Sequence, residues 1–185
     1  FVFASTLFVG GSYYTLKSLE SAAFNLKKGD MVKTAIFHQR AKLAMSVVNT
    51  NSQIFLPVID FFYEDLSSKS TKIVNFLNFA INTFDGITQT FVLSEKIYNA
   101  LNSPHNLDYN ASVLGIKSNL QQVYESLSQI EILLDGLDLP KPIYEAIKQN
   151  AEYENLKKTK DSLWEMSKLV DILPQIIGSD KNTNI

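Results

Sequence analysis

Apolar residues recur at steps of three and four along most of this chain, which is the spacing of one face of an α-helix. The most regular run lies between residues 113 and 137, where the two steps alternate without a gap. Its members are Val113, Ile116, Leu120, Val123, Leu127, Ile130, Leu134 and Leu137. This pattern predicts a helix with a packing seam of coiled-coil type, which would pack against another helix or another chain.

The first two helices are predicted from the residues that end and begin them. The first helix should end at Gly29, since glycine is favoured just past a helix C-terminus, and Asp30 should cap the next one. Pro57 is expected to kink or divide this second helix because proline removes a backbone donor. The apolar stripe expected to face the core consists of Val32, Ile36, Leu43, Val47, Ile54, Val58 and Phe61.

The remaining helices are bounded by polar and proline-containing segments. Three serines within residues 67–70 predict a break before a third helix, whose apolar positions run through 73–101. Residues 102–108 read as a loop, and a last helix is expected over 143–173. No hairpin-type strand signal is present. The fold class predicted is all-α, an elongated bundle of about five amphipathic helices continuous with an N-terminal membrane helix.

The first sixteen residues carry no charge. As a helix they would span about 24 Å, against ~30 Å for the core of a bilayer. We therefore expect the outer part of a transmembrane helix, with two tyrosines at the level of an aromatic belt. A buried core helix is the alternative, and a signal peptide fits less well because a small-residue cleavage site is missing. The anchor residues are Phe1, Val2, Phe3, Leu7, Phe8, Val9, Tyr13 and Tyr14.

Composition narrows the class of protein without adding a site. A chain of 185 residues with 45% hydrophobic residues can bury a real core. Its net charge of −2 gives no reason to expect nucleic acid as a partner. The chain has no cysteine, which excludes thiol catalysis, thiolate metal sites and disulfides from this sequence. Three parts are predicted: 1–16 in the membrane, 17–177 as a helical bundle, and 178–185 as a polar tail or linker to a missing downstream domain.

Candidate catalytic or metal-binding residues are few. His38 and His105 belong to no metal or triad motif and are expected to be solvated. Asp60 and Glu64 are four residues apart and are expected to share a helical face, with Asp65 beside them, and such carboxylates can hold a divalent cation weakly. The wet end of an amphipathic helix is the simpler interpretation of these three residues. The sequence therefore predicts no enzyme, no metal, no cofactor and no small-molecule substrate.

Two segments resemble known families. Residues 26–30, with Ala35 and Ala41 after them, are similar to the inter-helix turn of tetratricopeptide repeats, but no second copy follows about 34 residues on. The stretch 16–30 and then 173–178, which reads Leu-Pro-Gln-Ile-Ile-Gly, resembles the N-terminal region of the bacterial envelope family called domain of unknown function 4012. That resemblance implies one membrane helix, an extracytoplasmic helical part and a main domain that would begin where this sequence ends.

The expected function is that of a non-enzymatic, membrane-anchored spacer or interaction module of a bacterial cell envelope protein. It would be a single-pass protein that contacts membrane lipid and binds other protein chains, or copies of itself, through helix packing. An extracytoplasmic sensory ectodomain is one alternative, with the 102–108 loop bordering a ligand pocket. The other alternative is a pilin-like filament subunit, since mature type IV pilins also begin with Phe and an apolar helix, although Ser5 stands where they usually carry Glu.

Overall fold

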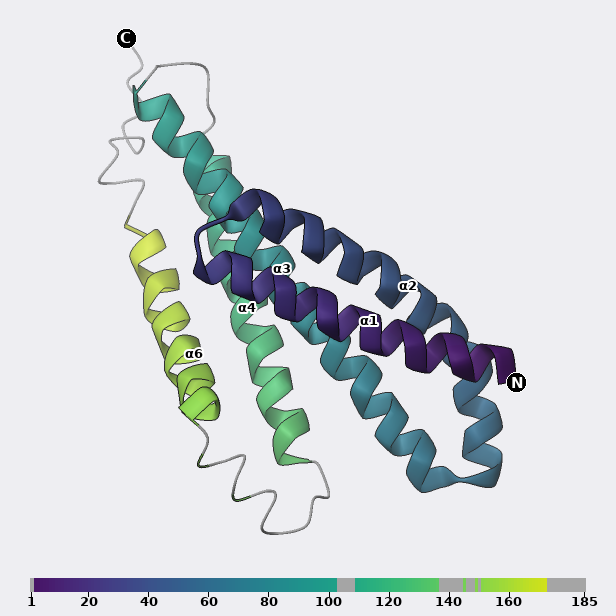
Figure 1. Ribbon diagram of the computed structural model, residues 1–185. Helices are drawn as coiled ribbons and strands as arrows, with labels where there is room; N and C mark the ends of the chain where they lie inside the picture. The colour runs from purple at the N-terminus through teal and green to yellow at the C-terminus, as the bar shows by residue number, and fades with distance from the viewer. Residues whose placement is uncertain (1, 103–108, 137–144, 146–148, 150, 173–185) are drawn as a thin grey trace. The chain divides into compact units, whose positions relative to one another are not determined.

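The chain folds into helices throughout the part that the structure describes, which is residues 2–102, 109–136, 145, 149 and 151–172 of a computed structural model. These residues contain no strand, so the all-α prediction is confirmed. The described helices are α1 (Val2–Lys27), α2 (Met31–Phe62), α3 (Glu64–Asn102), α4 (Tyr109–Asp135) and α6 (Ala151–Val170) (Figure 1). The chain forms two compact units, Phe1–Phe84 and Asp85–Ile185, and the division falls inside α3.

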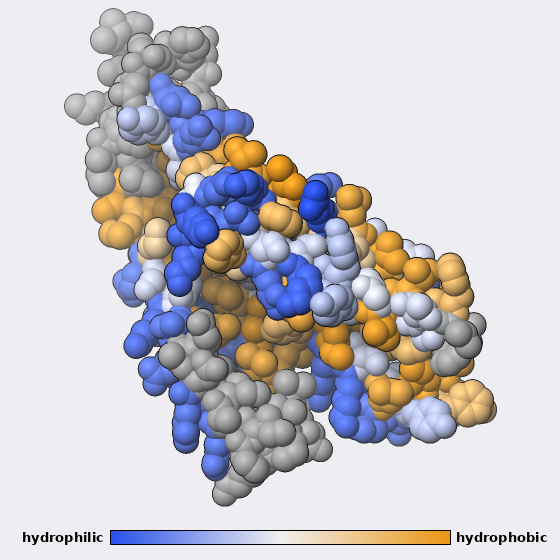
Figure 2. All heavy atoms as spheres, in the orientation of Figure 1, coloured by the Kyte–Doolittle hydropathy of each residue, from blue (hydrophilic) through white to orange (hydrophobic). Residues whose placement is uncertain are grey.

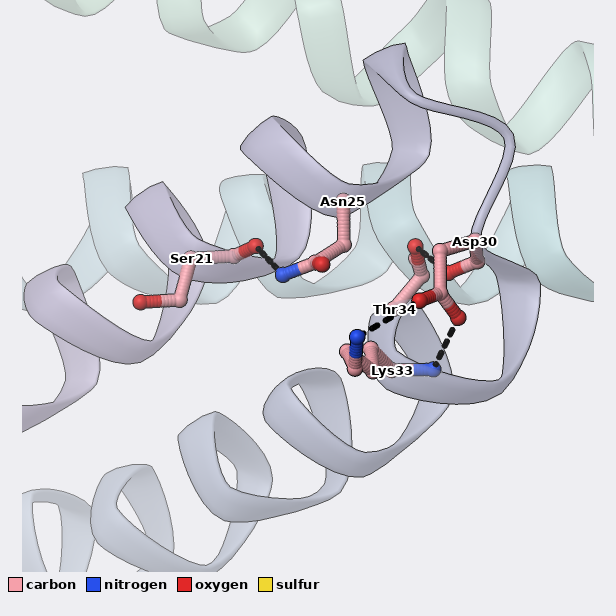
Figure 3. Close-up of polar contacts among 5 residues, drawn as sticks. All are labelled: Ser21, Asn25, Asp30, Lys33 and Thr34. Atoms are coloured by element: carbon pink, nitrogen blue, oxygen red, sulfur yellow. Dashed lines mark hydrogen bonds and ion pairs between the residues drawn. The ribbon is translucent and has the colours of Figure 1, made fainter.

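In the first unit, a tight turn joins α1 to α2 (Figure 3). Gly29 adopts φ 74°, a left-handed conformation that glycine reaches without steric cost. The backbone N–H groups of Gly29 and Asp30 donate to the carbonyls of Leu26 and Asn25, the pairing of a Schellman motif. The Asp30 carboxylate then accepts from the Lys33 backbone N–H at 3.0 Å and caps α2.

Helices α1 and α2 lie antiparallel (Figure 1) and meet along a seam that contains both small and large side chains. The buried positions of α2 alternate steps of three and four, which is a heptad pattern. They are Thr34, His38, Ala41, Met45, Val48, Ser52, Phe55 and Ile59. At Gly11 of α1 the backbones approach so closely that an added Cβ would lie 2.8 Å from Cγ2 of Val48.

Buried hydroxyl and amide groups in this seam bond to their own helix. Thr15 donates to the Gly11 carbonyl at 2.8 Å, and Thr34 donates to the Asp30 carbonyl at 2.8 Å. Asn25 donates to the Ser21 carbonyl at 2.7 Å. Because each group is satisfied locally, small polar residues can occupy a helix interface without leaving a buried donor unpaired.

The apolar stripe of α2 that was predicted to face the protein core lies instead on the outer side of this helix. All seven residues are exposed, from 39% at Val58 to 83% at Phe61. The prediction was wrong because α2 has two apolar faces, and the face with the heptad pattern packs against α1 and the beginning of α3. The apolar side chains of the other face point outward.

Two expected helix breaks also differ from the structure. Helix α2 continues through Pro57, and in Figure 1 its last turns run at an angle to the rest of the helix, as expected for a proline kink. The chain turns at Tyr63 rather than at the serines of 67–70. Ser67 and Ser70 are buried inside the beginning of α3, where acidic residues in the first turn favour the start of a helix.

The first part of α3 completes the core of the first unit. Val74, Leu77 and Ile81 pack with apolar residues of α1 and α2, including the stacked pair Phe8 and Phe55, whose ring centroids are 4.9 Å apart. Asn49 of α2 and Asn78 of α3 exchange amide hydrogen bonds at 3.3 Å. This reciprocal pair fixes the register between the two helices, since each amide both donates and accepts.

The second unit is built from the later part of α3, α4 and α6. Its core contains Ile97 of α3, a row of apolar residues of α4 and Val170 of α6. Helices α3 and α4 approach closely at Gly86, where an added Cβ would lie 2.9 Å from the Asn119 carbonyl oxygen. Each unit therefore contains one glycine that allows close helix contact.

The adjacent glycines of α1 allow a matched test of this packing. We expect Gly10→Ala to stabilise the protein by roughly 1 kcal/mol, because alanine favours a helix and no atom lies within 4 Å of the new Cβ. Gly11→Ala should be less stable than Gly10→Ala by about 1–3 kcal/mol, because its Cβ would overlap Val48. Urea unfolding of both purified variants measures the difference, and equal stability would contradict the close approach.

Candidate interaction surfaces

Charge divides the α1–α2 hairpin into two halves. No charged residue occurs in residues 2–16 of α1 or in residues 43–59 of α2. The antiparallel register, in which Gly11 lies against Val48, places these two segments side by side. We call them together the uncharged half, and residues 17–42 around the turn the basic half. The basic half has six basic and two acidic residues, which gives a net charge of +4.

The uncharged half is apolar on its outside. Figure 2 shows hydrophobic residues gathered where α1 begins and α2 ends, and hydrophilic residues nearer the turn. On α2, the outward residues of this half are Leu43, Val47, Ile54 and Val58, and all are exposed. Large apolar side chains thus lie outside as well as inside this hairpin, whereas a helix of an ordinary bundle has a polar outer face.

The predicted anchor residues fall on both sides of α1. Phe3, Val9, Tyr13 and Tyr14 are exposed, whereas Phe8 is buried against Phe55 and Leu7 is half-buried. The side chains of the first two residues lie outside the described part. No helix in the described part of the chain has the length and apolar character needed to cross a bilayer.

In the basic half, two cations lie over aromatic rings that line a groove between α1 and α2. The Lys28 ammonium is 4.0 Å from the centroid of Phe24, and the Arg40 guanidinium is 5.3 Å from that of Phe37. Both rings border the groove, together with Asn25. Long basic side chains that lie along apolar groups in this way keep their charge at the surface of the protein.

Two ion pairs moderate the charge of this half. The Lys17 ammonium donates to Glu20 at 2.7 Å, and this hydrogen bond raises the pKa of Lys17. The hydrogen bond from the Lys33 backbone N–H, followed by that from its ammonium, lowers the pKa of Asp30. Both acidic residues of the basic half are therefore paired with lysine of the same helix or turn.

The predicted seam of α4 lies mainly inside the second unit. Buried seam residues are Val113, Ile116, Leu120, Val123 and Ile130. Leu127 and Leu134 are half-buried, and Leu137 lies outside the described residues. Ile97 and Leu93 of α3, with Leu163 and Val170 of α6, belong to the same core cluster as the first three of these residues. The seam thus faces neighbouring helices of its own unit.

Polar contacts join α6 to α4 near both ends of the interface between these two helices. Lys160 of α6 donates to Glu131 of α4, and this hydrogen bond raises the pKa of Lys160. Lys117 of α4 donates to Asp171 at 2.6 Å, just after α6. Between them, the rings of Tyr124 and Trp164 lie 5.6 Å apart at the edge of an open groove.

The structure changes the interpretation of the candidate chemical residues. His38 was expected to be solvated, but it is only 5% exposed and its ring lies 5.9 Å from that of Phe84. Asp60 lies in the last turn of α2, whereas Glu64 is the first residue of α3. The prediction that these two residues share a helical face was therefore wrong. Asp65 is paired with Lys69 at 2.7 Å. Within the described ranges, no group of three or more acidic or histidine residues could hold a metal ion, and His105 lies outside them.

A sequence signal for the outward stripe of α2 does exist. Val32, Leu43 and Ile54 are each eleven residues apart, and so are Ile36, Val47 and Val58. Eleven residues make just over three helical turns, so each set of three lies nearly in line along the helix. The buried seam of α2 follows a heptad instead. Two different periods on one helix indicate two different contact surfaces.

Comparison with other proteins gives no assignment, since no protein-family model, curated protein sequence or solved structure matches this chain. The surfaces described above are therefore the basis for a functional proposal.

A pair of lysines in α6 tests how α6 is held to α4. Lys160 and Glu131 are shielded, with side chains 17% and 20% exposed, whereas the Lys158–Glu154 pair is 75% and 68% exposed. We expect Lys160→Met to lower the free energy of unfolding by about 1–3 kcal/mol, since Glu131 loses a charged hydrogen bond in a partly shielded place. Lys158→Met should change it by less than about 0.5 kcal/mol. Equal effects in chemical denaturation would contradict the structural role of Lys160.

Proposed function

We propose that this chain is a non-enzymatic helical module that associates with a membrane through its first unit and packs against protein through its helices. The observation that carries the proposal is the exposed apolar face of the α1–α2 hairpin. Large residues such as Phe8 and Phe55 are buried in the hairpin beside alanine, serine and threonine, and further large apolar residues are exposed on a half that has no charge.

The exposed apolar side chains of the hairpin support a membrane as its partner, because without a partner they would remain in contact with water. A contiguous apolar surface in contact with water is unfavourable and marks an interaction site in soluble and membrane proteins alike. Small residues and locally bonded hydroxyls between helices, as at Gly11 and Thr15, are typical of helix packing in lipid. The exposed Tyr13 and Tyr14 adjoin Lys17, where the charges begin, as aromatic residues do at a membrane interface.

The remaining parts of the proposal rest on the sequence. The resemblance to the envelope family supports a single-pass bacterial envelope protein whose helical part is extracytoplasmic. In that setting the second unit would act as a spacer, and protein partners or further copies would pack against its exposed helix surfaces. The exposed side chains available for this include Leu114 and Trp164.

Extraction of the protein from membranes of its source cells tests the proposal. We expect the protein to sediment with the membranes, to remain there in high salt and at alkaline pH, and to be released by detergent. Apolar contact with lipid resists salt and pH, whereas electrostatic contact with a peripheral partner does not. Recovery of the protein in the soluble fraction, or its release by salt alone, would contradict membrane association.

A further inference from the structure

We propose that the outward face of α2 is a second lipid-contacting surface, so that the whole α1–α2 hairpin, and not α1 alone, lies on an anionic membrane surface. This inference rests on the proposed membrane association and extends it to a helix that the sequence assigned to the core. The uncharged half would lie among the acyl chains, and the basic half would lie among the headgroups.

The geometry of the stripe favours a flat partner. Its eleven-residue spacing keeps Val32, Leu43 and Ile54 nearly in line along a straight helix. A left-handed coiled-coil partner needs a heptad spacing, and α2 already presents that spacing to α1 through Ala41, Met45 and Val48. A flat bilayer surface can bury a straight stripe along its full length.

The charge pattern disfavours a second copy of α2 as the occupant. The helix has three basic residues, Lys33, Arg40 and Lys42, and its acidic residue Asp60 lies at the far end. A parallel copy would bring like charges together. An antiparallel copy in full overlap would pair Lys33 with Asp60 but would leave Arg40 and Lys42 opposite uncharged residues. Anionic headgroups, in contrast, provide the opposite charge for the basic half.

The position of the cations is consistent with an interfacial hairpin. Lys28 and Arg40 lie over the rings of Phe24 and Phe37, at the groove between the two helices of the basic half. Each pair thus joins an apolar ring, suited to the acyl boundary, with a cation suited to a headgroup phosphate. The uncharged half begins beyond Arg40 and Lys42. The apolar residues that would enter the acyl layer and the basic residues that would contact headgroups are therefore separated along the hairpin.

Flotation of the purified full chain with lipid vesicles tests the inference. The vesicles are pure phosphatidylcholine, or phosphatidylcholine mixed with phosphatidylglycerol. Ile54→Glu in α2 should weaken binding to both by about tenfold or more, because a charge would enter the apolar layer in place of a buried isoleucine. Ile132→Glu in α4 is the matched control, since Ile132 is 60% exposed and Ile54 is 59% exposed. The control should bind like the original chain.

The basic half is tested by a double variant, Lys28→Gln with Arg40→Gln. Each charge near an anionic surface contributes about fivefold to binding, so the pair should lower binding to the phosphatidylglycerol vesicles by about 25-fold. Binding to pure phosphatidylcholine should not change. Equal loss on both kinds of vesicle, or no loss on either, would overturn the proposed headgroup contact.

Val9→Glu in α1 separates failure of this inference from failure of the proposed function. Val9 is exposed on the uncharged half of α1. If Val9→Glu abolishes binding while Ile54→Glu binds normally, α1 alone contacts lipid, so the inference is overturned and the proposed function stands. If the original chain floats with neither kind of vesicle, both fail. Circular dichroism should show unchanged helix content in every variant, because all five positions are exposed.

Discussion

Two helices can approach as closely as α1 and α2 do at Gly11 only if the side chains between them are small. The seam satisfies this condition at Gly11, and other buried positions of the hairpin are occupied by alanine, serine or threonine. The Thr15 and Thr34 hydroxyls donate to carbonyls of their own helix. Larger residues of α2 such as Phe55 and Ile59 are buried in the core that α3 completes, whereas seven other apolar residues of α2 lie on its outer face. The packing of the hairpin thus leaves exposed the surface to which we assign its function.

The two units differ in where their apolar and charged side chains lie. In the first unit, apolar side chains are divided between a core with α3 and an exposed face, and the charges of the hairpin, apart from Asp60 near the end of α2, lie in its basic half. In the second unit, the apolar row of α4 is turned inward, and α6 is joined by ion pairs at Lys160 and Lys117. The second unit has the polarity of a water-exposed bundle. A hairpin in contact with lipid and a bundle in contact with water are compatible with a module that holds protein at a membrane.

Much of the fold could be predicted from the sequence where local chemistry decides it. Gly29 and Asp30 define the first turn because a left-handed conformation and a capping carboxylate need those residue types. The seam of α4 could be predicted because only one of its faces is consistently apolar. The buried face of α2 could not, because hydrophobicity favours Val32, Leu43 and Ile54, whereas packing selects the smaller Thr34, Ala41 and Ser52. Burial of His38 and the turn at Tyr63 likewise depend on tertiary contacts, and no local residue pattern indicates them.

The account is tested most directly by spin labels along α2 in vesicles that contain phosphatidylglycerol. The chain has no cysteine, so a single introduced cysteine provides one label at a chosen position. Labels at Leu43 and Ile54 should be accessible to oxygen and shielded from a water-soluble nickel complex, because they lie on the lipid face. Labels at the neighbouring Lys42 and Gln53, which are exposed on another side of the helix, should be accessible to the nickel complex. If all four labels are equally accessible to nickel, or if those at Leu43 and Ile54 are shielded from both reagents, α2 does not face lipid and the central claim is wrong.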